Sequence, residues 1–458
     1  MSACAGFNFL EQSELPAPQV TDAQACEILS THYGITAHAT SLGSQQDKNF
    51  MVTDDDGTAI GVLKVANPAF TAVELQAQDA AAQLIADAEP NLRVAVPLAN
   101  TSGEKCTTID GLVDGTAFVR LLRYLPGGTL LESGYLTPAA VAGLGEVAGR
   151  VSRALKDFTH PGLDRILQWD LRFGMDVVDE LSSHVSDPEL RARLDTSARE
   201  AWSRIAPLDD VLPRQAAHID LTDANVVVSR DAGGPRPDGI IDFGDLSHTW
   251  AVSELAVTAS SVLGHPGAQL TSVLPAIRAF HVVRPLSAVE ADALWPLLVL
   301  RTAVLIVSGA QQAVLDPDND YITEQSDAET RMFELATSVP LDVMSAVIAA
   351  ALGLASPPAP VQAQARLVEV DPATVVALDL SSTSEVYDDA FDSAGVLSND
   401  VEAHSATAAL DHGAALVVTR FGEARLSRAP RLSQDAPEVV ATGITLWSAT
   451  DTGLTAPW

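Results

Sequence analysis

Cysteine and lysine are both scarce in this chain, and each scarcity excludes a class of protein. The three cysteines, Cys4, Cys26 and Cys106, are scattered without paired spacing, which excludes a disulfide framework or a zinc knuckle. The only lysines are Lys48, Lys64, Lys105 and Lys156. With a net charge of −33, the chain is unsuited to bind nucleic acid or an anionic membrane through general electrostatics. A lysine inside a predicted strand is therefore of particular interest.

Long apolar runs and a targeting signal are also missing. The longest apolar runs, 302–309 and 343–352, are too short to span a bilayer. Glu11 and Glu14 interrupt the N-terminal apolar residues and no basic segment precedes them, so a signal peptide is not expected. The composition, 47% hydrophobic and 19% charged, favours a folded protein, and 458 residues suggest two or three domains. We expect a cytoplasmic protein.

The most informative stretch is residues 216–247, AAHIDLTDANVVVSRDAGGPRPDGIIDFGDLS. Two short apolar runs, 226–228 and 239–241, flank a polar turn rich in glycine and proline, which predicts a β-hairpin. Asp220 and Asn225 lie on the segment that enters this hairpin, and Asp242 follows its second strand. The hairpin should therefore bring these three side chains together.

These residue types suit phosphoryl transfer from ATP. The reaction needs a carboxylate that orients the attacking hydroxyl and accepts its proton, and oxygen ligands for Mg²⁺ on the phosphates. Asp220 fits the first role, and Asn225 and Asp242 fit the second. The alternative is an ordinary hairpin whose acidic residues cap turns.

The pattern HxDLxxxN followed by IDFGD resembles the catalytic hairpin of the aminoglycoside phosphotransferase and choline kinase group, which is related to the protein kinases. The resemblance covers about residues 30–330 and implies an α+β, two-lobed protein-kinase-like fold that uses ATP and Mg²⁺. It also implies that His218 supports the loop through hydrogen bonds, and that Asp223 and Asp245 lie just behind the site.

Residues 35–64 alternate between apolar and polar types and predict a β-meander after a helix over 21–32. The resemblance places the loop 42–50 over the ATP phosphates, with Ser44, Gln45 and Asn49 as nucleotide contacts, although the loop lacks the repeated glycines of protein kinases. The alternative is a plain hairpin loop.

Lys64 ends an apolar strand, 61–65, and resembles the kinase lysine that holds the α- and β-phosphates. The alternative is a strand-end lysine that extends into solvent. In kinases a carboxylate from the next helix, here roughly 71–87, pairs with this lysine. Glu74 is the expected partner, and Gln76 would replace it if the alignment shifts by two residues.

Two further strands are expected at 94–97 and 118–122, and residues 122–125 resemble the hinge between the kinase lobes. Helical periodicities follow at 137–158 and 184–206, and again at 250–263, 267–283, 287–315 and 326–352.

Three residues are candidates for contact with the substrate. The stretch around Asp170 and Arg172 resembles the hydroxylysine kinase-like branch of the family. Asp170 is otherwise a helix N-terminal acid and Arg172 a surface arginine. Glu254 suits an amine-binding acid and equally a first-turn acid that the helix dipole favours.

The C-terminal part is predicted to be a separate module. Residues 356–366 are a proline-rich linker after an N-terminal lobe (1–122) and a helical lobe (123–355). Residues 367–458 contain short strands, among them 414–419 and 441–447, and resemble the start of a lysostaphin-like peptidase domain. Ala441 and Thr445 stand where that peptidase has its His-x-x-x-Asp ligands, so no zinc site is expected.

The leading interpretation is a small-molecule kinase that phosphorylates an amino alcohol or a hydroxy-amino acid. A non-catalytic nucleotide-binding scaffold and an aminoglycoside-type resistance enzyme are the alternatives, and a protein kinase is disfavoured because no Ala-Pro-Glu follows the DFG-like turn. The resemblance further implies fusion to, or action with, a class III aminotransferase-like domain. On that view the chain is part of a longer protein, and a natural gene product of 48.0 kDa would contradict this.

Overall fold

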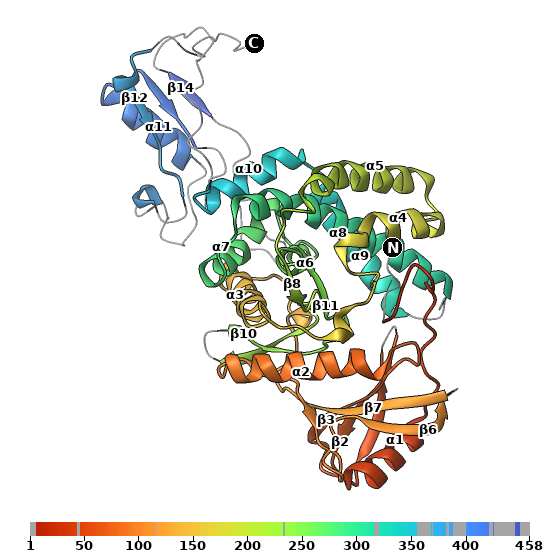
Figure 1. Ribbon diagram of the computed structural model, residues 1–458. Coiled ribbons are helices and arrows are strands. Elements are labelled where there is room, and N and C mark those ends of the chain that lie inside the picture. The colour runs from red at the N-terminus through yellow and green to blue at the C-terminus, as the bar shows by residue number, and fades with distance from the viewer. Residues whose placement is uncertain are drawn as a thin grey trace. The chain divides into compact units, whose positions relative to one another are not determined.

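The computed structural model describes residues 6–43, 46–113, 115–231, 234–315, 320–354, 368, 370–381, 384–387, 400–420, 425 and 445–448 (Figure 1). Its contacts divide the chain into two compact units, Met1–Ala355 and Ser356–Trp458. The division lies at the start of the proline-rich segment. The first unit consists of a small, sheet-containing lobe and a larger helical lobe, which confirms the expected two-lobed α+β fold.

An antiparallel sheet of order β1-β2-β3-β7-β5, with β6 also paired to β7, forms the small lobe (Figure 1). Its strands are β1 (His38–Leu42), β2 (Lys48–Thr53), β3 (Ala59–Val65), β5 (Pro97–Leu98), β6 (Thr107–Val113) and β7 (Gly115–Arg123). Gly61 allows β3 to approach β7 closely, since a Cβ there would lie 2.7 Å from the Leu122 carbonyl oxygen. Strand β6 was not predicted, because charged and glycine residues break its alternation.

Local capping signals begin the helices of the small lobe. Thr21 and Thr71 each form a capping box, with Gln24 and Glu74 respectively. Helix α1 (Asp22–Ile28) continues into a π-helical turn, η1 (Leu29–Tyr33), and α2 (Ala72–Ala88) follows β3. The buried face of α2 packs on the large-lobe core, and Asp79 of the same helix pairs with Arg120 of β7, so this helix joins the two lobes.

The predicted hairpin is present in the large lobe as β9 (Val226–Asp231) and β10 (Gly234–Ile240). Strand β4 (Arg93–Val94) adds to β10 in parallel, and β8 (Arg214–Ala217) pairs with β11 (Ser247–Trp250) on either side of the hairpin. The interlobe connection crosses directly over β9 at Gly127, where φ is +124° and a Cβ would lie 1.9 Å from the Val228 carbonyl oxygen. Only glycine fits there.

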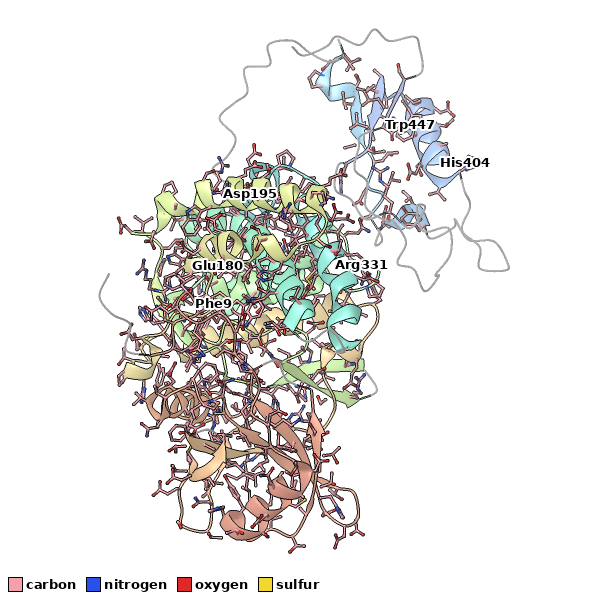
Figure 2. The ribbon with its side chains drawn as sticks, turned by 90° about the vertical axis from the view of Figure 1, so that its right-hand side faces the viewer. Phe9, Glu180, Asp195, Arg331, His404 and Trp447 are labelled. Atoms are coloured by element: carbon pink, nitrogen blue, oxygen red, sulfur yellow. The ribbon has the colours of Figure 1, made fainter. Side chains whose placement is uncertain are left out.

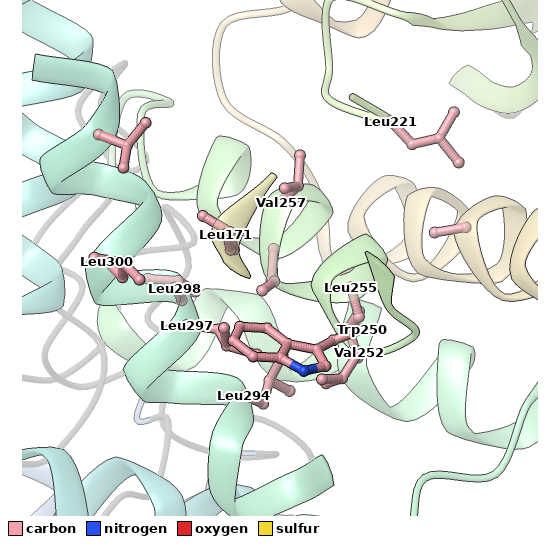
Figure 3. Packing of buried hydrophobic residues seen from close by; sticks show 14 of the residues in the cluster. Leu171, Leu221, Trp250, Val252, Leu255, Val257, Leu294, Leu297, Leu298 and Leu300 are labelled. Atoms are coloured by element: carbon pink, nitrogen blue, oxygen red, sulfur yellow. The ribbon is translucent and has the colours of Figure 1, made fainter. Parts of the chain in front are cut away.

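Helices build the rest of the large lobe around one apolar core (Figures 1 and 3). They are α3 (Pro138–Ala154), α4 (Gly174–Leu181), α5 (Pro188–Ile205), α6 (Ser253–Val262), α7 (Leu274–Val283), α8 (Ala288–Leu315), α9 (Asp320–Ala336) and α10 (Leu341–Ala351). Short 3₁₀ helices are η2 (Leu130–Glu132), η3 (Pro161–Leu163), η4 (Leu171–Phe173), η5 (Ser182–His184), η6 (Ala206–Leu208) and η7 (Leu270–Val273). Trp250 packs there among Leu294, Leu297 and Leu298 of α8.

Helix α8 is the central helix of this core. Among the described residues it is the one continuous helix long and apolar enough to cross a membrane, yet 83% of its most apolar window is buried inside the protein. A helix over 287–315 was predicted, and the apolar run 302–309 within it is short because polar residues such as Arg301 interrupt the apolar sequence without ending the helix. Its burial is that of a core helix.

The N-terminal segment belongs with the large lobe, which corrects the expected boundary of 1–122. Phe7 and Phe9 are buried in the large-lobe core, and Asn8 forms a β-bridge with Ile166 (Figure 2). The core of the small lobe begins only at Val20. Sequence periodicity does not reveal this packing, because the segment has too few residues for a pattern.

The described residues of the second unit form a three-stranded sheet of order β12-β13-β14 and an α-helix, α11 (Val401–Asp411). The strands are β12 (Val375–Ala377), β13 (Leu416–Val418) and β14 (Leu446–Ser448), with the 3₁₀ helices η8 (Pro372–Thr374) and η9 (Glu385–Tyr387). Strand β12 is parallel to β13, and β14 is antiparallel to it. Ala441 lies outside the described residues, and Thr445 donates its N–H to Thr419 Oγ1.

Candidate active site

Asp220 lies on a strained loop between β8 and β9. The residue before it, Ile219, has a φ of +51°, a conformation that β-branched residues rarely adopt. His218 Nδ1 accepts the Asp220 N–H at 3.3 Å and Nε2 lies 3.1 Å from the Ile241 carbonyl oxygen. Burial lowers the pKa of His218 to about 4, so the ring is neutral and supports the loop, as the resemblance implied.

Glu254 accepts a hydrogen bond from the backbone of the same loop. Its Oε2 accepts the His218 N–H at 2.8 Å, and the residue is fully buried at the start of α6. Burial raises the pKa of Glu254 to about 7, although the N–H groups of His218 and Ile219 oppose the shift. The prediction that Glu254 binds a substrate amine was wrong, because its carboxyl group is enclosed and occupied by the loop backbone.

The carboxyl group of Asp220 is placed for proton transfer. Asn225 donates from Nδ2 to the carboxylate and also, at 3.0 Å, to the Asp220 carbonyl oxygen. Arg301 of α8 reaches to 3.7 Å from Oδ1, and the Asp220 side chain is 26% exposed. Burial and the neighbouring Asp245 raise the pKa of Asp220 well above its usual range, while Arg301 opposes the rise. A raised pKa suits a general base.

Asp242 is the second residue of the site with a left-handed backbone, at φ +56°. Its Oδ1 accepts from Lys64 Nζ at 2.8 Å and from the Gly244 N–H at 3.0 Å. Burial alone would raise the pKa of Asp242, but the Lys64 ammonium outweighs it and lowers the pKa to about 2. The structure therefore brings Lys64, Asp220, Asn225 and Asp242 together.

Lys64 is buried between two carboxylates, Asp242 and Asp47, the latter 3.1 Å from Nζ. Burial would lower the pKa of Lys64, but these two charges outweigh it and raise it above its ordinary value. Asp47 was missed, although it lies in the loop 42–50 that was predicted to contact the phosphates.

Asn49 pairs with Lys64 in the β2–β3 register and its Oδ1 is buried, whereas Ser44 and Gln45 lie outside the described residues.

The predicted pairing of Lys64 with Glu74 was wrong. Glu74 is the third residue of α2, and its carboxylate folds back to accept the Thr71 N–H at 2.7 Å and the Phe7 N–H at 3.1 Å. The same carboxylate lies 3.4 Å from Arg165 Nε. Glu74, which the kinase resemblance assigned to Lys64, therefore forms a local capping box with Thr71 instead. Gln76, the other candidate, is exposed.

The acid of α2 that faces the sheet pairs with an arginine instead. Asp79 Oδ1 accepts from Arg120 Nη1 at 2.7 Å, and Gln78 Oε1 accepts from Nη2 at 2.8 Å. Arg120 lies opposite Lys64 on the neighbouring strand β7. Burial raises the pKa of Asp79, and Arg120 opposes the shift. The helix-to-sheet ion pair is thus present one strand away from the lysine.

The chemistry of Asn225 and Asp242 fits Mg²⁺. They supply a neutral and an anionic oxygen ligand from adjacent positions, because the Ile241 N–H donates to the Asn225 carbonyl oxygen at 3.0 Å. The described residues contain no group of three or more His, Cys, Asp or Glu side chains that would hold a metal ion alone. Two protein ligands match the way Mg²⁺ is usually held, with nucleotide phosphates completing its coordination.

Asp170 and Arg172 bind each other. Asp170 is fully buried and accepts from Arg172 Nε at 3.0 Å and from Thr249 Oγ1 at 2.6 Å, so the prediction that it contacts substrate was wrong. It caps η4, as its alternative interpretation expected. Arg172 lines a cavity of about 360 Å³ together with His160, Arg165 and His248.

Besides Asp47, two residues near the catalytic loop were not predicted from the sequence. His265 Nε2 lies 2.8 Å from Asp223 Oδ2 and ties the catalytic loop to the end of α6, while Nδ1 lies 2.8 Å from the Gly134 carbonyl oxygen. Burial would lower the pKa of His265, but Asp223 raises it above its ordinary value. Arg301 is the other. A charged residue inside an otherwise apolar helix was the available signal for it.

A small apolar cluster lies next to the predicted hinge. Ala95, Leu125 and Val227 are buried together, and Ile241 packs against them. The residues come from the interlobe segment and from the hairpin that carries the polar groups. Apolar side chains of this kind line most small-molecule and cofactor sites.

Comparisons with known proteins agree with this geometry. A model of the phosphotransferase enzyme family (APH) matches residues 38–284, more than half of the chain. Hydroxylysine kinase of Danio rerio is 26% identical over 318 residues, covering 66% of this chain and 87% of that protein. Hydroxylysine kinase of Mus musculus is 26% identical over 349 residues, covering 70% and 89%.

Solved structures share the fold. A microcompartment-associated aminopropanol kinase has a TM-score of 0.55 at 18% identity and covers 69% of this chain and 96% of its own. The amicoumacin kinase hAmiN has a TM-score of 0.53 at 14% identity, with 70% and 94% covered. With its catalytic hairpin and these relatives, the chain belongs to the phosphotransferase enzyme family, in the branch that resembles the hydroxylysine kinases, and is a small-molecule kinase.

Proposed function

We propose that this protein transfers the γ-phosphoryl group of Mg·ATP to the hydroxyl group of a small hydroxylated amine, either an amino alcohol or a hydroxy-amino acid. The observation that carries the proposal is the convergence of Asp220, Asn225, Asp242 and buried Lys64 at the mouth of one hairpin. Positioning and charge stabilisation are what this reaction requires of a protein.

Each residue of the site has a separate role in the transfer. Asp220 orients the acceptor hydroxyl and accepts its proton while the hydroxyl oxygen bonds to the γ-phosphorus and the bond to the β-phosphate oxygen breaks, releasing ADP. Lys64, held by Asp47 and Asp242, binds phosphate oxygens. Asn225 and Asp242 would hold Mg²⁺, which neutralises charge on the phosphates when bound.

Two observations weigh against the other candidates. A non-catalytic scaffold has no need for a carboxyl group with a raised pKa next to a strained backbone, yet Asp220 and Ile219 provide both. An aminoglycoside-type acceptor carries several positive charges, and the buried guanidinium of Arg301, 3.7 Å from Asp220, is unfavourable for such a cation.

The names of the relatives support a small hydroxylated amine but leave one chemical feature open. Hydroxylysine carries a carboxylate, whereas aminopropanol does not, and both names occur among the proteins that this chain resembles. The proposed activity therefore includes both acceptor types.

The test is acceptor-dependent release of ADP from Mg·ATP across a panel of amino alcohols, hydroxy-amino acids and aminoglycosides. Asp220→Asn should lower kcat by at least about a thousandfold without weakening nucleotide binding, because it removes the proton acceptor but keeps the side-chain shape. Asp157→Asn, which changes an exposed aspartate beyond the end of α3, is the matched control and should be unaffected. Mg·ATP binding without turnover on any acceptor would refute the proposal.

A further inference from the structure

Arg301 is an unusual residue for the middle of α8. Its side chain is 4% exposed, and its guanidinium lies over the Trp169 ring at 4.7 Å. Neither Nε nor Nη1 has a hydrogen-bond partner within the described part of the chain. A buried charge whose donors are unused is costly to a folded protein, so such a group is a candidate for binding a ligand.

The position of Arg301 indicates which ligand. Its Nη2 is 3.7 Å from Oδ1 of Asp220, which is beyond hydrogen-bond distance but within strong electrostatic range in a buried site. Asp245, beyond the hairpin, and Glu329, from α9, also act on its charge. Arg301 is therefore a cation among three acids, directly beside the group that receives the acceptor hydroxyl.

We propose that Arg301 binds the carboxylate of the acceptor, which makes the physiological acceptor a hydroxy-amino acid and not the corresponding amino alcohol. This inference rests on the proposed function of the same site. A guanidinium with free N–H donors is the usual partner of a carboxylate, and the Trp169 ring packs against this guanidinium.

Charge complementarity supports the same choice. A hydroxy-amino acid is zwitterionic and presents both a carboxylate for Arg301 and an ammonium for the acids whose charges act on Arg301. An amino alcohol presents the ammonium alone, which would lie in the field of a buried guanidinium and leave its donors unpaired. A site built to bond a polar group rejects analogues that lack it, by factors that reach about ten-thousandfold.

A purely structural role for Arg301 predicts a different result. If Arg301 only held Asp220 in place, its loss would slow every acceptor equally, because all acceptors use the same base. The carboxylate role predicts that its loss lowers activity far more with acceptors that carry a carboxylate than with acceptors that lack one. The measurement must therefore compare matched acceptors.

The experiment measures kcat/KM for pairs that differ only in the carboxylate: serine and ethanolamine, threonine and 1-amino-2-propanol, and 5-hydroxylysine and 1,5-diamino-2-pentanol. The full chain is compared with Arg301→Met, which keeps the length and apolar stem of the side chain, and with Arg301→Lys, which keeps the charge but not the planar fork. Arg284→Met is the matched control, because Arg284 is a partly buried arginine on the same lobe that pairs with Glu290.

We expect the wild type to prefer the amino acid of its best pair by at least about a hundredfold. Arg301→Met should reduce this ratio to within about tenfold of unity, chiefly by raising KM for the amino acid, while kcat/KM for the amino alcohol changes less than about tenfold. Arg301→Lys should give an intermediate ratio, and Arg284→Met should leave it unchanged.

Two results would overturn the inference. One is a wild type that uses the amino alcohol as well as, or better than, the amino acid, which needs no variant to fold. The other is an unchanged ratio in Arg301→Met with both acceptors slowed alike. Either result leaves the proposed kinase activity intact. A wild type that binds Mg·ATP but releases no ADP with any of the acceptors would instead contradict the proposed function itself.

Discussion

Replacing Glu254 with glutamine should remove a pH-dependent loss of stability from the large lobe. Glu254 is fully buried beneath the catalytic loop, and its pKa is raised to about 7 from an ordinary value of 4.5. An amide oxygen at this position can still accept the His218 N–H, which the carboxylate accepts at 2.8 Å. Glu254→Gln therefore changes the ionisation at this site and preserves the support of the loop.

The sign follows from proton linkage. Below pH 4.5 the carboxyl group is protonated in both the folded and the unfolded chain, and it contributes no pH dependence. Between pH 4.5 and 7 only the unfolded chain loses the proton, so the free energy of unfolding falls as pH rises. At about 1.4 kcal/mol per pKa unit, the full loss above pH 7 is about 3 kcal/mol.

The assay is urea unfolding of the full chain followed by tryptophan fluorescence at a series of pH values from 4 to 8.5. Subtracting the wild-type free energy of unfolding from that of Glu254→Gln cancels the other titrating groups and the second unit. Any effect of the added NH₂ group is a constant offset. The difference should rise by about 3 kcal/mol across this range. A flat difference would refute the claim that Glu254 is buried as the neutral acid.

Three further predictions concern the site and its surroundings. Asp245→Asn should move the acidic limb of the kcat/KM profile to lower pH, because Asp245 raises the pKa of Asp220 and its loss lets the base stay ionised in more acidic solution; an unmoved or raised limb would contradict this coupling. Asp47→Asn should raise KM for ATP by about three- to tenfold, because it removes one of the two anions that position Lys64. Glu74→Gln should lower thermal stability but leave KM for ATP unchanged, and the opposite pattern would restore the pairing expected of kinases.

The sequence was sufficient for the local features of this protein. The spacing of Asp220, Asn225 and Asp242 around one hairpin predicted their convergence, because two adjacent antiparallel strands bring their ends together whatever surrounds them. Most helices also followed from periodicity and capping signals, which are short-range properties of the chain, whereas the two lobes followed from the family resemblance. Lys64 was recognised because so few lysines compete with it.

Partners that are distant in sequence were decided only by the tertiary structure. Whether Lys64 pairs with Glu74 or Asp47 depends on how α2 packs against the sheet. Glu74 is unavailable to Lys64 because its carboxylate caps the N-terminus of α2. Asp170 and Glu254 likewise were candidate substrate contacts in the sequence, and packing buried both.

Arg301 shows the same limit most clearly. It follows Asp220 by 81 positions, and helical periodicity places it only on a helix, with no indication of what that helix faces. Sequence determines which groups the chain can offer. The packing of α8 against the catalytic loop decides which of them meet, because burial sets both the contact and the strength of the charge interaction that results.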